Sequence, residues 1–214
     1  MKESTNREKV LKKIRDAIID KSDNPYQNID FESSVYSTSA DSLDIIFAEA
    51  FNESNGSFIY CADEKEFLNN FHYLATQKNW QNIFCFDDDL TELLELSRIN
   101  FSSDYQYFNQ QKVGVTTCEF LIARTGSIMV SSKQMSGRKL NFYPEKHIVI
   151  AYTSQLVADL KNALKEIRIK YTQMPSMISI ITGPSSNVDI EYSKYTGSFG
   201  PKELYLFLID NQSF

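Results

Sequence analysis

The chain has 214 residues, of which 42% are hydrophobic and 23% are charged, and its formal net charge is −6. This length and composition suit one sizeable globular domain, with or without an appendage, and exclude low-complexity and fibrous structure. The charge is uneven, because residues 1–21 carry +3, residues 22–110 carry −13 and residues 111–214 carry +4. An acidic middle of this size argues against general nucleic-acid binding.

The three cysteines, Cys61, Cys85 and Cys118, are widely spaced and form no Cys-x-x-Cys pair. This spacing predicts buried free thiols and argues against a disulfide framework, a zinc site or an iron–sulfur cluster, so we expect no metal and no cofactor. The first residues lack the apolar stretch of a signal peptide, and no apolar run is long enough to span a membrane. We therefore expect a soluble, cytoplasmic protein that binds neither nucleic acid nor membrane.

Residues 4–21 have the periodicity of an amphipathic helix, with Leu11, Ile14 and Ile18 on one face and lysines on the other. Residues 22–38 are polar and irregular, which is typical of a linker or a wrapping arm. We predict an N-terminal helix and polar arm over residues 1–38 and a single α/β domain over residues 39–214.

Helical and strand patterns alternate through the acidic middle of the chain. Asp63 and Glu66 have the spacing of a capping box, and the run from Asp87 to Asp89 could bind a metal but fits better as an N-cap with first-turn acids. This alternation predicts an α/β domain with largely parallel strands. We expect helices over residues 40–52, 63–78 and 87–96, and buried strands over residues 57–61 and 82–86.

The pattern from residue 113 onwards is more mixed. Thr116 and Thr117 could cap a one-turn helix over residues 118–121, and two short strands flank the turn at Thr125-Gly126-Ser127. Such a hairpin would make the sheet mixed. A basic loop, a strand over residues 144–151 and a helix that starts at Thr153 or Ser154 are expected to follow.

Two Gly-Pro turns lie close together near the C-terminal end of the sequence. Gly183-Pro184 follows the apolar run 177–181, and Gly200-Pro201 precedes the apolar strand 204–209. Ser185 and the two residues after it are good N-caps, so we expect a short helix whose N-terminal N–H groups would suit an anion. The alternative is a pair of tight turns without a ligand.

With these elements in view, the C-terminal half resembles the lactate-utilisation (LUD) domain family, which includes lactate-utilisation protein C and YkgG-type proteins. The matching pieces follow the family's order and cover about half of the chain. They are Val113 to Ala123, Thr125-Gly126-Ser127, Arg138, Pro144-x-x-His147-Ile148, Thr182-Gly-Pro-Ser185, Asp189-Ile-Glu191 and Gly197-x-x-Gly200-Pro-Lys-Glu203.

The resemblance implies an α/β fold of the NagB/RpiA and CoA-transferase type, with three layers, a mostly parallel or mixed sheet and helices on both of its faces. It also implies a role beside iron–sulfur and redox partner subunits that oxidise L-lactate to pyruvate. The clusters of such a system belong to separate chains, and the cysteine pattern fits a subunit that carries none.

Five positions in three places depart from the family's pattern. Ser186, Asn187 and Val188 stand where relatives commonly have Arg-Thr-Ala, Phe199 replaces a histidine, and Arg124 replaces an acidic residue. The missing arginine would have supplied a guanidinium that can bind a carboxylate through two hydrogen bonds, and the missing histidine an imidazole that can transfer a proton near neutral pH. Arg124 or Lys202 could supply compensating charge, and the set indicates a diverged family member.

Glu119, Asp189 and Glu191 are the candidate catalytic carboxylates. Asp189 directly follows the turn that suits an anion. Asp189 and Glu191 alternate as they would on a strand and would diverge by about 160° in a helical turn, and we do not expect them to act as a matched pair. Glu119 could be a nucleophile of the CoA-transferase kind or a solvated helix residue. The predicted ligand-binding residues are Thr125, Gly126, Arg138, His147, Gly183, Pro184, Ser185, Gly200 and Lys202.

His72 and His147 are the two histidines, and both have a structural alternative. His147 precedes a strand and could line a cleft beside the basic loop. Two histidines so far apart predict no His-rich metal site, and no nucleophile-elbow motif supports a Ser–His–Asp triad.

Two functions from different classes follow from these residues. The first is a cluster-free accessory subunit of an L-lactate-oxidising iron–sulfur system, or a diverged paralogue that binds a small anion. The second is a stand-alone enzyme of the CoA-transferase or isomerase type that acts on an acyl or sugar-phosphate substrate. A binding module with a decayed site is a third reading, and the sequence leaves homo-oligomerisation open.

Overall fold

The computed structural model describes residues 5–19, 40–106, 112–136, 138–188, 194–196 and 200–211. The chain divides into two compact units, Met1–Ser39 and Ala40–Phe214. Among the described residues, no helix combines the length and the apolar character needed to cross a bilayer.

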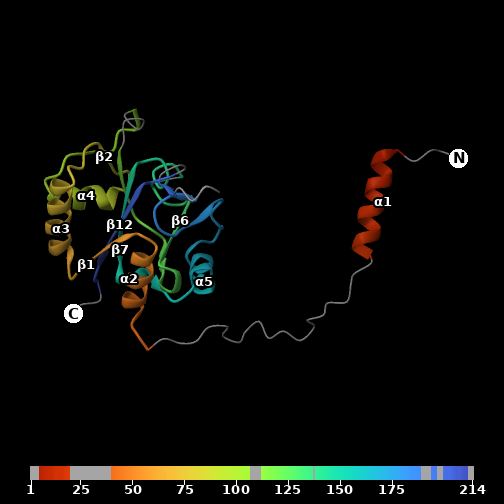
Figure 1. Ribbon diagram of the computed structural model, residues 1–214, viewed down its shortest axis with the longest axis horizontal. Coiled ribbons are helices and arrows are strands. Elements are labelled where there is room, and N and C mark those ends of the chain that lie inside the picture. Colours follow the sequence, from red (N-terminus) through yellow and green to blue (C-terminus); the bar gives the residue numbers. More distant parts are fainter. Residues whose placement is uncertain are drawn as a thin grey trace. The chain divides into compact units, whose positions relative to one another are not determined.

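The first unit contains helix α1 (Asn6–Ile19), which Figure 1 shows in red. Thr5 and Glu8 cap its start reciprocally, because Glu8 N donates to Thr5 Oγ1 (3.3 Å) and Thr5 N donates to Glu8 Oε2 (2.8 Å). Val10, Leu11 and Ile14 form the predicted apolar face, and each of these side chains is about half exposed.

The second unit is built on a six-stranded sheet in which all neighbouring strands are parallel. Its order is β1 (Ser57–Cys61), β12 (Glu203–Ile209), β7 (Lys146–Tyr152), β4 (Val113–Thr116), β2 (Ile83–Phe84) and β3 (Phe101–Ser102). The central strands read as nearly continuous apolar runs because both of their faces are buried.

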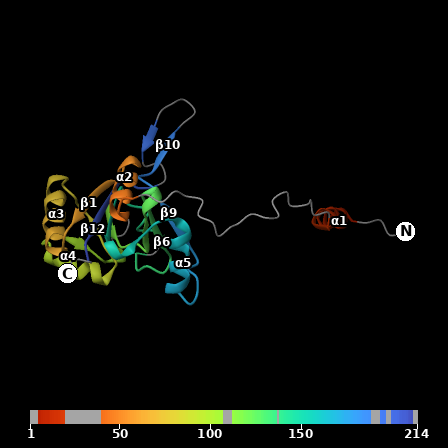
Figure 2. The same cartoon turned by 90° about the horizontal axis from the view of Figure 1, so that it is seen from below.

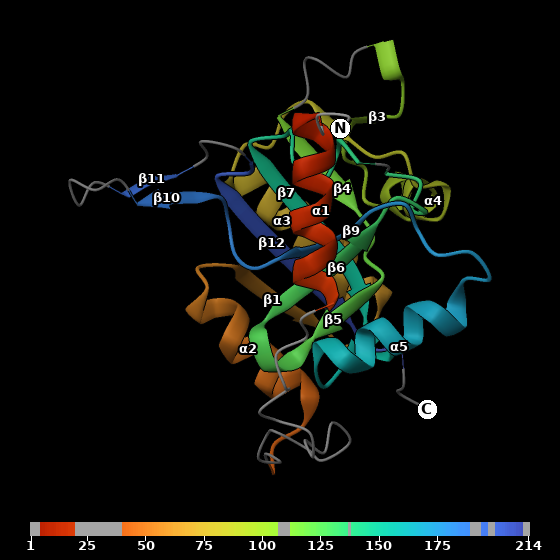
Figure 3. The ribbon, with the colours of Figure 1, turned by 90° about the vertical axis from the view of Figure 1, so that its right-hand side faces the viewer.

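A second sheet of four strands packs on one face of the first. Its order is β8 (Leu156–Val157), β5 (Phe120–Ile122), β6 (Ser127–Ser131) and β9 (Ile178–Ile181). β5 and β6 form the predicted hairpin around Gly126, and β9 adds to β6 in antiparallel register. The smaller hairpin of β10 (Ser186–Val188) and β11 (Lys194–Thr196) projects from the larger sheets in Figure 3.

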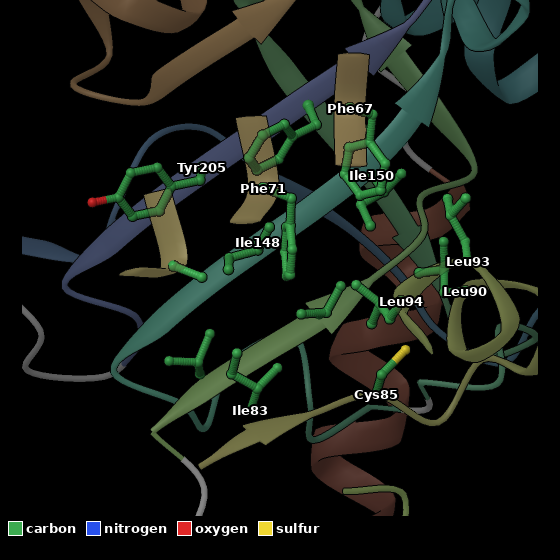
Figure 4. Close-up of a cluster of buried hydrophobic side chains, with 14 of the residues drawn as sticks. Phe67, Phe71, Ile83, Cys85, Leu90, Leu93, Leu94, Ile148, Ile150 and Tyr205 are labelled. Carbon is green, nitrogen blue, oxygen red and sulfur yellow. The ribbon is translucent and has the colours of Figure 1, made fainter. Parts of the chain in front are cut away.

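Helices α3 (Glu64–Gln77) and α4 (Asp88–Leu96) cover the opposite face of the six-stranded sheet (Figure 1). Figure 4 shows the apolar cluster beneath them, in which Phe67 and Phe71 of α3 meet the sheet. Their ring centroids lie 5.3 and 5.8 Å from that of Phe207 on β12. The predicted cap is present at the start of α3, where Asp63 Oδ1 accepts from Glu66 N at 2.7 Å.

Helix α2 (Leu43–Glu53) lies on the same face of the six-stranded sheet as the second sheet. Phe47 and Phe51 of α2 pack with Leu206 of β12 and with residues of β5 and β6. Helix α5 (Leu160–Lys170) covers the outer face of the second sheet through Ala163 and Ile167, and Figure 2 shows it beyond β6. The predicted α/β class and mostly parallel sheet are therefore confirmed, and the second sheet adds a layer to the three that were expected.

Three local predictions were wrong because residues that were expected to form or begin a helix pair as strands. Residues 120–122 form β5 and not a one-turn helix. Thr153–Gln155 is a 3-10 turn before β8, so α5 starts later and is capped by Asp159. Residues 186–188 form β10, because they pair with residues 194–196 and do not turn into a helix.

Phe207→Ala should lower the free energy of unfolding by about 3–5 kcal/mol, because it opens a cavity among the rings that join α3 to the sheet. Urea unfolding followed by circular dichroism measures the change. Ile169→Ala on the exposed face of α5 is the control and should cost no more than about 0.5 kcal/mol. Equal losses in the two variants would contradict this packing.

Candidate functional site

The structure brings the two Gly-Pro turns together. Ser185 N donates to Pro201 O at 2.8 Å, and a Cβ on Gly200 would lie 3.1 Å from Cβ of Ser185. However, β10 and not a helix follows Ser185. The helix N-terminus that was expected to attract an anion is therefore absent from this turn.

Gly126 and Gly183 are required by the packing of their turns against the end of α2. Both have left-handed backbones, with φ of 55° and 70°. A Cβ would lie 2.2 Å from Phe51 N at Gly126 and 2.1 Å from Ser54 O at Gly183. These two turns are thus a structural junction between α2 and the second sheet.

Hydroxyl groups tie the same junction together. Ser127 Oγ donates to Thr125 Oγ1 at 2.7 Å and lies 2.8 Å from Thr182 Oγ1. Pro184, beside Gly183, is half-buried. The hydroxyl of Thr125 therefore serves the turn itself.

The two predicted cationic residues lie at the surface. Lys202 Nζ is 3.8 Å from Glu145 Oε1, and Arg138 Nη2 donates to Ser176 Oγ at 2.6 Å. Lys202 directly precedes β12, at the amino end of that strand. The guanidinium of Arg138 lies by Ser176, next to the Ser131–Ile178 end of β6 and β9.

Glu119 is buried, so the interpretation of this residue as a solvated helix residue was wrong. It lies just before β5, and its carboxylate accepts hydrogen bonds from Ser131 Oγ (2.5 Å), Lys170 Nζ (2.7 Å) and Tyr171 OH (2.9 Å). These donors compensate the cost of burying the charge. Burial lowers the pKa of Lys170, but the hydrogen bond and charge of Glu119 outweigh it and hold that pKa above its ordinary value.

Glu119 and the Gly183 turn do not face one site. Ser131, which binds Glu119, pairs with Ile178 at one end of β6 and β9, whereas Ile128 pairs with Ile181 towards the other end, next to Gly183. The second sheet therefore separates them along the length of two strands. Asp189, Glu191 and Phe199 lie outside the described residues, and the roles assigned to them remain predictions.

His147 is fully buried between the two sheets. Its Nε2 lies 2.8 Å from Thr116 Oγ1, and its Nδ1 has no hydrogen-bond partner within the described part of the chain. Burial lowers the pKa of His147 to about 3, so the imidazole is neutral near pH 7. A neutral, enclosed ring can donate or accept one hydrogen bond but cannot supply a positive charge.

Several buried polar side chains come from β4, from β7 and from the connection before β7, and we call this set the interlayer polar residues. Some of them come from the stretch between β4 and β7, where the sequence showed only short polar runs. A chain of hydrogen bonds from Asp87 through Thr117 and Gln134 reaches the main chain of Ser131. The set comprises Thr116, Ser136, Asn141 and His147. Glu119 and Ser131 are also buried, but they meet Lys170 and Tyr171 at the end of α5.

Sequence reasoning missed Gln134, Lys170 and Tyr171. None of them belongs to a motif, and Lys170 and Tyr171 follow Glu119 by 51 and 52 residues. Only the packing of α5 on the second sheet brings them to Glu119.

The carboxyl ends of the parallel strands are hollowed and acidic. A cavity of about 580 Å³ there is lined by Asp63, Glu64 and Asp210 among others, and a neighbouring one of about 460 Å³ by Glu64, Asp89 and Glu92 among others. Ligands of open α/β sheets commonly bind at this edge, but such a lining disfavours a small anion. No group of three His, Cys, Asp or Glu residues in the described ranges could hold a metal ion.

Glu119→Gln should lower the free energy of unfolding by about 2–3 kcal/mol, because an amide cannot replace a carboxylate that binds three donors. Lys170→Met should cost about 1 kcal/mol or less, because the lysine side chain is 48% exposed. Chemical unfolding measures both. The exposed Glu49→Gln is the matched control, and an equal effect in it would refute the buried network.

His147 should make stability depend on pH. Its pKa is about 3 in the folded chain and about 6.5 when unfolded, so the unfolded state binds the extra proton between these values. Its contribution is complete above pH 6.5 and is lost as the pH falls towards 3. The stability advantage of the wild type over His147→Gln should shrink by about 2 kcal/mol between pH 7 and pH 5.

The measurement is urea unfolding of both proteins at several pH values. Thr116→Val keeps the imidazole buried and should keep the wild-type pH dependence. An advantage over His147→Gln that does not change with pH would contradict a buried, neutral ring.

Known proteins resemble this chain in sequence and in fold. It is 38% identical over 105 residues to the uncharacterized protein YkgG of Escherichia coli, which covers 47% of this chain and 46% of that protein. It is 32% identical over 102 residues to lactate utilization protein C of Shouchella clausii, covering 47% and 44%. The chain thus matches these curated relatives over about half of their length.

A solved structure, that of a duf162 family protein from Deinococcus radiodurans, superposes with a TM-score of 0.58 at 12% identity. It covers 78% of this chain and 96% of that one, which supports the fold alone. The family model of the LUD domain matches residues 5–209, and the chain therefore belongs to the LUD domain family.

Proposed function

We propose that this chain serves lactate utilisation as an accessory subunit that carries no iron–sulfur cluster and works beside partner chains that do. The observation that carries the proposal is the LUD-domain match over residues 5–209, together with relatives named lactate utilization protein C. The oxidation itself would belong to the partner chains, and this subunit would bind a small anion or dock a redox partner.

The positions of the cysteines support a subunit without a cluster. Cys61 and Cys85 lie in the apolar cluster beneath α3 and α4, whereas Cys118 lies in the cluster on the opposite face of the sheet. Burial raises the pKa of the Cys85 thiol to about 12 and raises those of the other two. Cluster ligation needs convergent thiolates, and these three thiols are separated and held protonated.

The buried network favours this role over a stand-alone enzyme of the CoA-transferase or isomerase type. As a nucleophile, Glu119 would have to release Ser131, Lys170 and Tyr171, and a substrate would have to enter a fully buried position. Asp189 and Glu191 are the carboxylates left for that second function.

Deleting the gene in its host should abolish growth on L-lactate as sole carbon source and leave growth on glucose intact. Complementation with the wild type should restore growth, and so should each single variant Cys61→Ala, Cys85→Ala and Cys118→Ala, because no thiol holds a cluster. The chain tagged in lactate-grown cells should co-purify with chains that contain iron and sulfide, while the chain purified alone contains no stoichiometric iron.

Undiminished growth on L-lactate after deletion would contradict the role in lactate utilisation. Stoichiometric iron in the isolated chain, lost in a folded cysteine variant, would sink the cluster-free assignment. Growth that depends on the chain without any co-purifying partner would favour the enzyme over the subunit.

A further inference from the structure

The connection between β6 and β7 covers strand β4 from one end to the other. At the carboxyl end, Gln134 Nε2 donates to Thr117 Oγ1 at 3.2 Å. At the amino end, a Cβ on Gly114 would lie 2.8 Å from Cγ of Pro144 and 3.0 Å from Leu140 O. The described parts of this connection, residues 132–136 and 138–145, therefore have an inner face directed at β4.

Burial within the connection separates an inner from an outer face. Ser136 and Leu140 are 5% and 0% exposed, whereas Met135 and Tyr143 are 59% and 61% exposed. Ser136 follows Gln134 by two residues, so its hydroxyl lies between the two anchor points, on the side of the sheet.

His147 lies on β7, next to the strand β4 that the connection covers. It pairs in register with Gly114 on the neighbouring strand, and its ring contacts Thr116 of β4. The connection that buries Ser136 thus also passes over the strand that borders His147.

Two buried polar atoms, Oγ of Ser136 in the connection and Nδ1 of His147 on β7, have no hydrogen-bond partner within the described residues. Buried polar groups are almost always hydrogen-bonded, so each such atom requires an explanation. Both come from the interlayer polar residues, and together they offer a hydroxyl and an imidazole nitrogen to one small guest.

The chemistry of the two groups suits an oxygen-rich guest. With Thr116 on Nε2, the free Nδ1 can donate to a carboxylate or accept from a hydroxyl, depending on the tautomer. The Ser136 hydroxyl can do the same. A carboxylate that enters a buried site also needs a positive charge nearby. Arg138 lies two residues after Ser136, and one of the five N–H donors of its guanidinium binds Ser176.

We propose that Ser136 and His147 form a binding site for a small 2-hydroxy- or 2-oxo-monocarboxylate, and that Arg138 supplies the countercharge. The choice of this ligand class rests on the proposed role in lactate utilisation, whereas the site rests on the two unpaired atoms. The occupant is small because the connection packs closely on β4 at Gly114.

The test uses the full chain with ¹⁵N-labelled histidine, whose two histidines give two sets of ring-nitrogen signals in NMR spectra. L-lactate and pyruvate are titrated at constant ionic strength, with chloride and inorganic phosphate as comparison anions. His147→Gln assigns the signals. His72, which lies 3.0 Å from Ser97 O and outside the site, is the internal reference.

L-lactate or pyruvate should shift the His147 ring signals in a saturable way and leave those of His72 in place. Ser136→Ala should weaken binding about tenfold, as the loss of one charge-assisted hydrogen bond would. Ser154→Ala is the matched control, because that hydroxyl accepts a hydrogen bond from Asn211 and has no contact with Ser176, and it should bind within about twofold of the wild type. Arg138→Ala should also weaken binding, and thermal unfolding verifies that each variant folds.

His147 signals that respond to neither compound would overturn the site, and so would wild-type affinity in folded Ser136→Ala. Phosphate or chloride producing the same shift would overturn the ligand class. Because growth on L-lactate is measured separately, a silent His147 with a lactate growth defect removes this site alone, whereas binding without a growth defect removes the pathway role alone.

Discussion

The contact between the six-stranded and the four-stranded sheet is the constraint on which the rest of the α/β unit depends. It buries the second face of β4, β7 and β12, whose first face is already covered by α3 and α4. The side chains on both faces of these strands must therefore be apolar or hydrogen-bonded, and β7 and β12 are mostly apolar. His147 of β7 is the exception, because its Nδ1 has no partner within the described residues. The same contact fixes α2, because the glycine turns of the second sheet fit against the end of that helix only without a Cβ.

This contact also explains where the polar chemistry of the unit lies. Glu119 can be buried because α5, which closes the outer face of the second sheet, brings Lys170 and Tyr171 to it. His147 can be buried because it stays neutral and binds Thr116. The layered packing thus removes both residues from bulk water, where they would have been candidates for acid–base chemistry. Buried in this way, they can stabilise the packing or bind a small enclosed ligand.

The cavities at the carboxyl ends of the parallel sheet are lined by several carboxylates, whereas Lys202 lies at the amino end of β12. The acidic lining makes these larger hollows poor sites for an anionic ligand. The three cysteines are likewise divided, because Cys61 and Cys85 lie on one face of this sheet and Cys118 lies on the other.

The sequence by itself determined the elements whose signals are local. Short, nearly continuous apolar runs specified the parallel strands, and the spacing of Asp63 and Glu66 specified the start of α3, because both signals depend on neighbours within a few residues. Only the tertiary structure decided that residues 120–122 and 186–188 are strands and that Glu119, Ser136 and His147 are buried. Each of these depends on a partner many residues away, such as Met129, Thr196 or Tyr171, and the free energy of such contacts is not encoded in any short stretch of the chain.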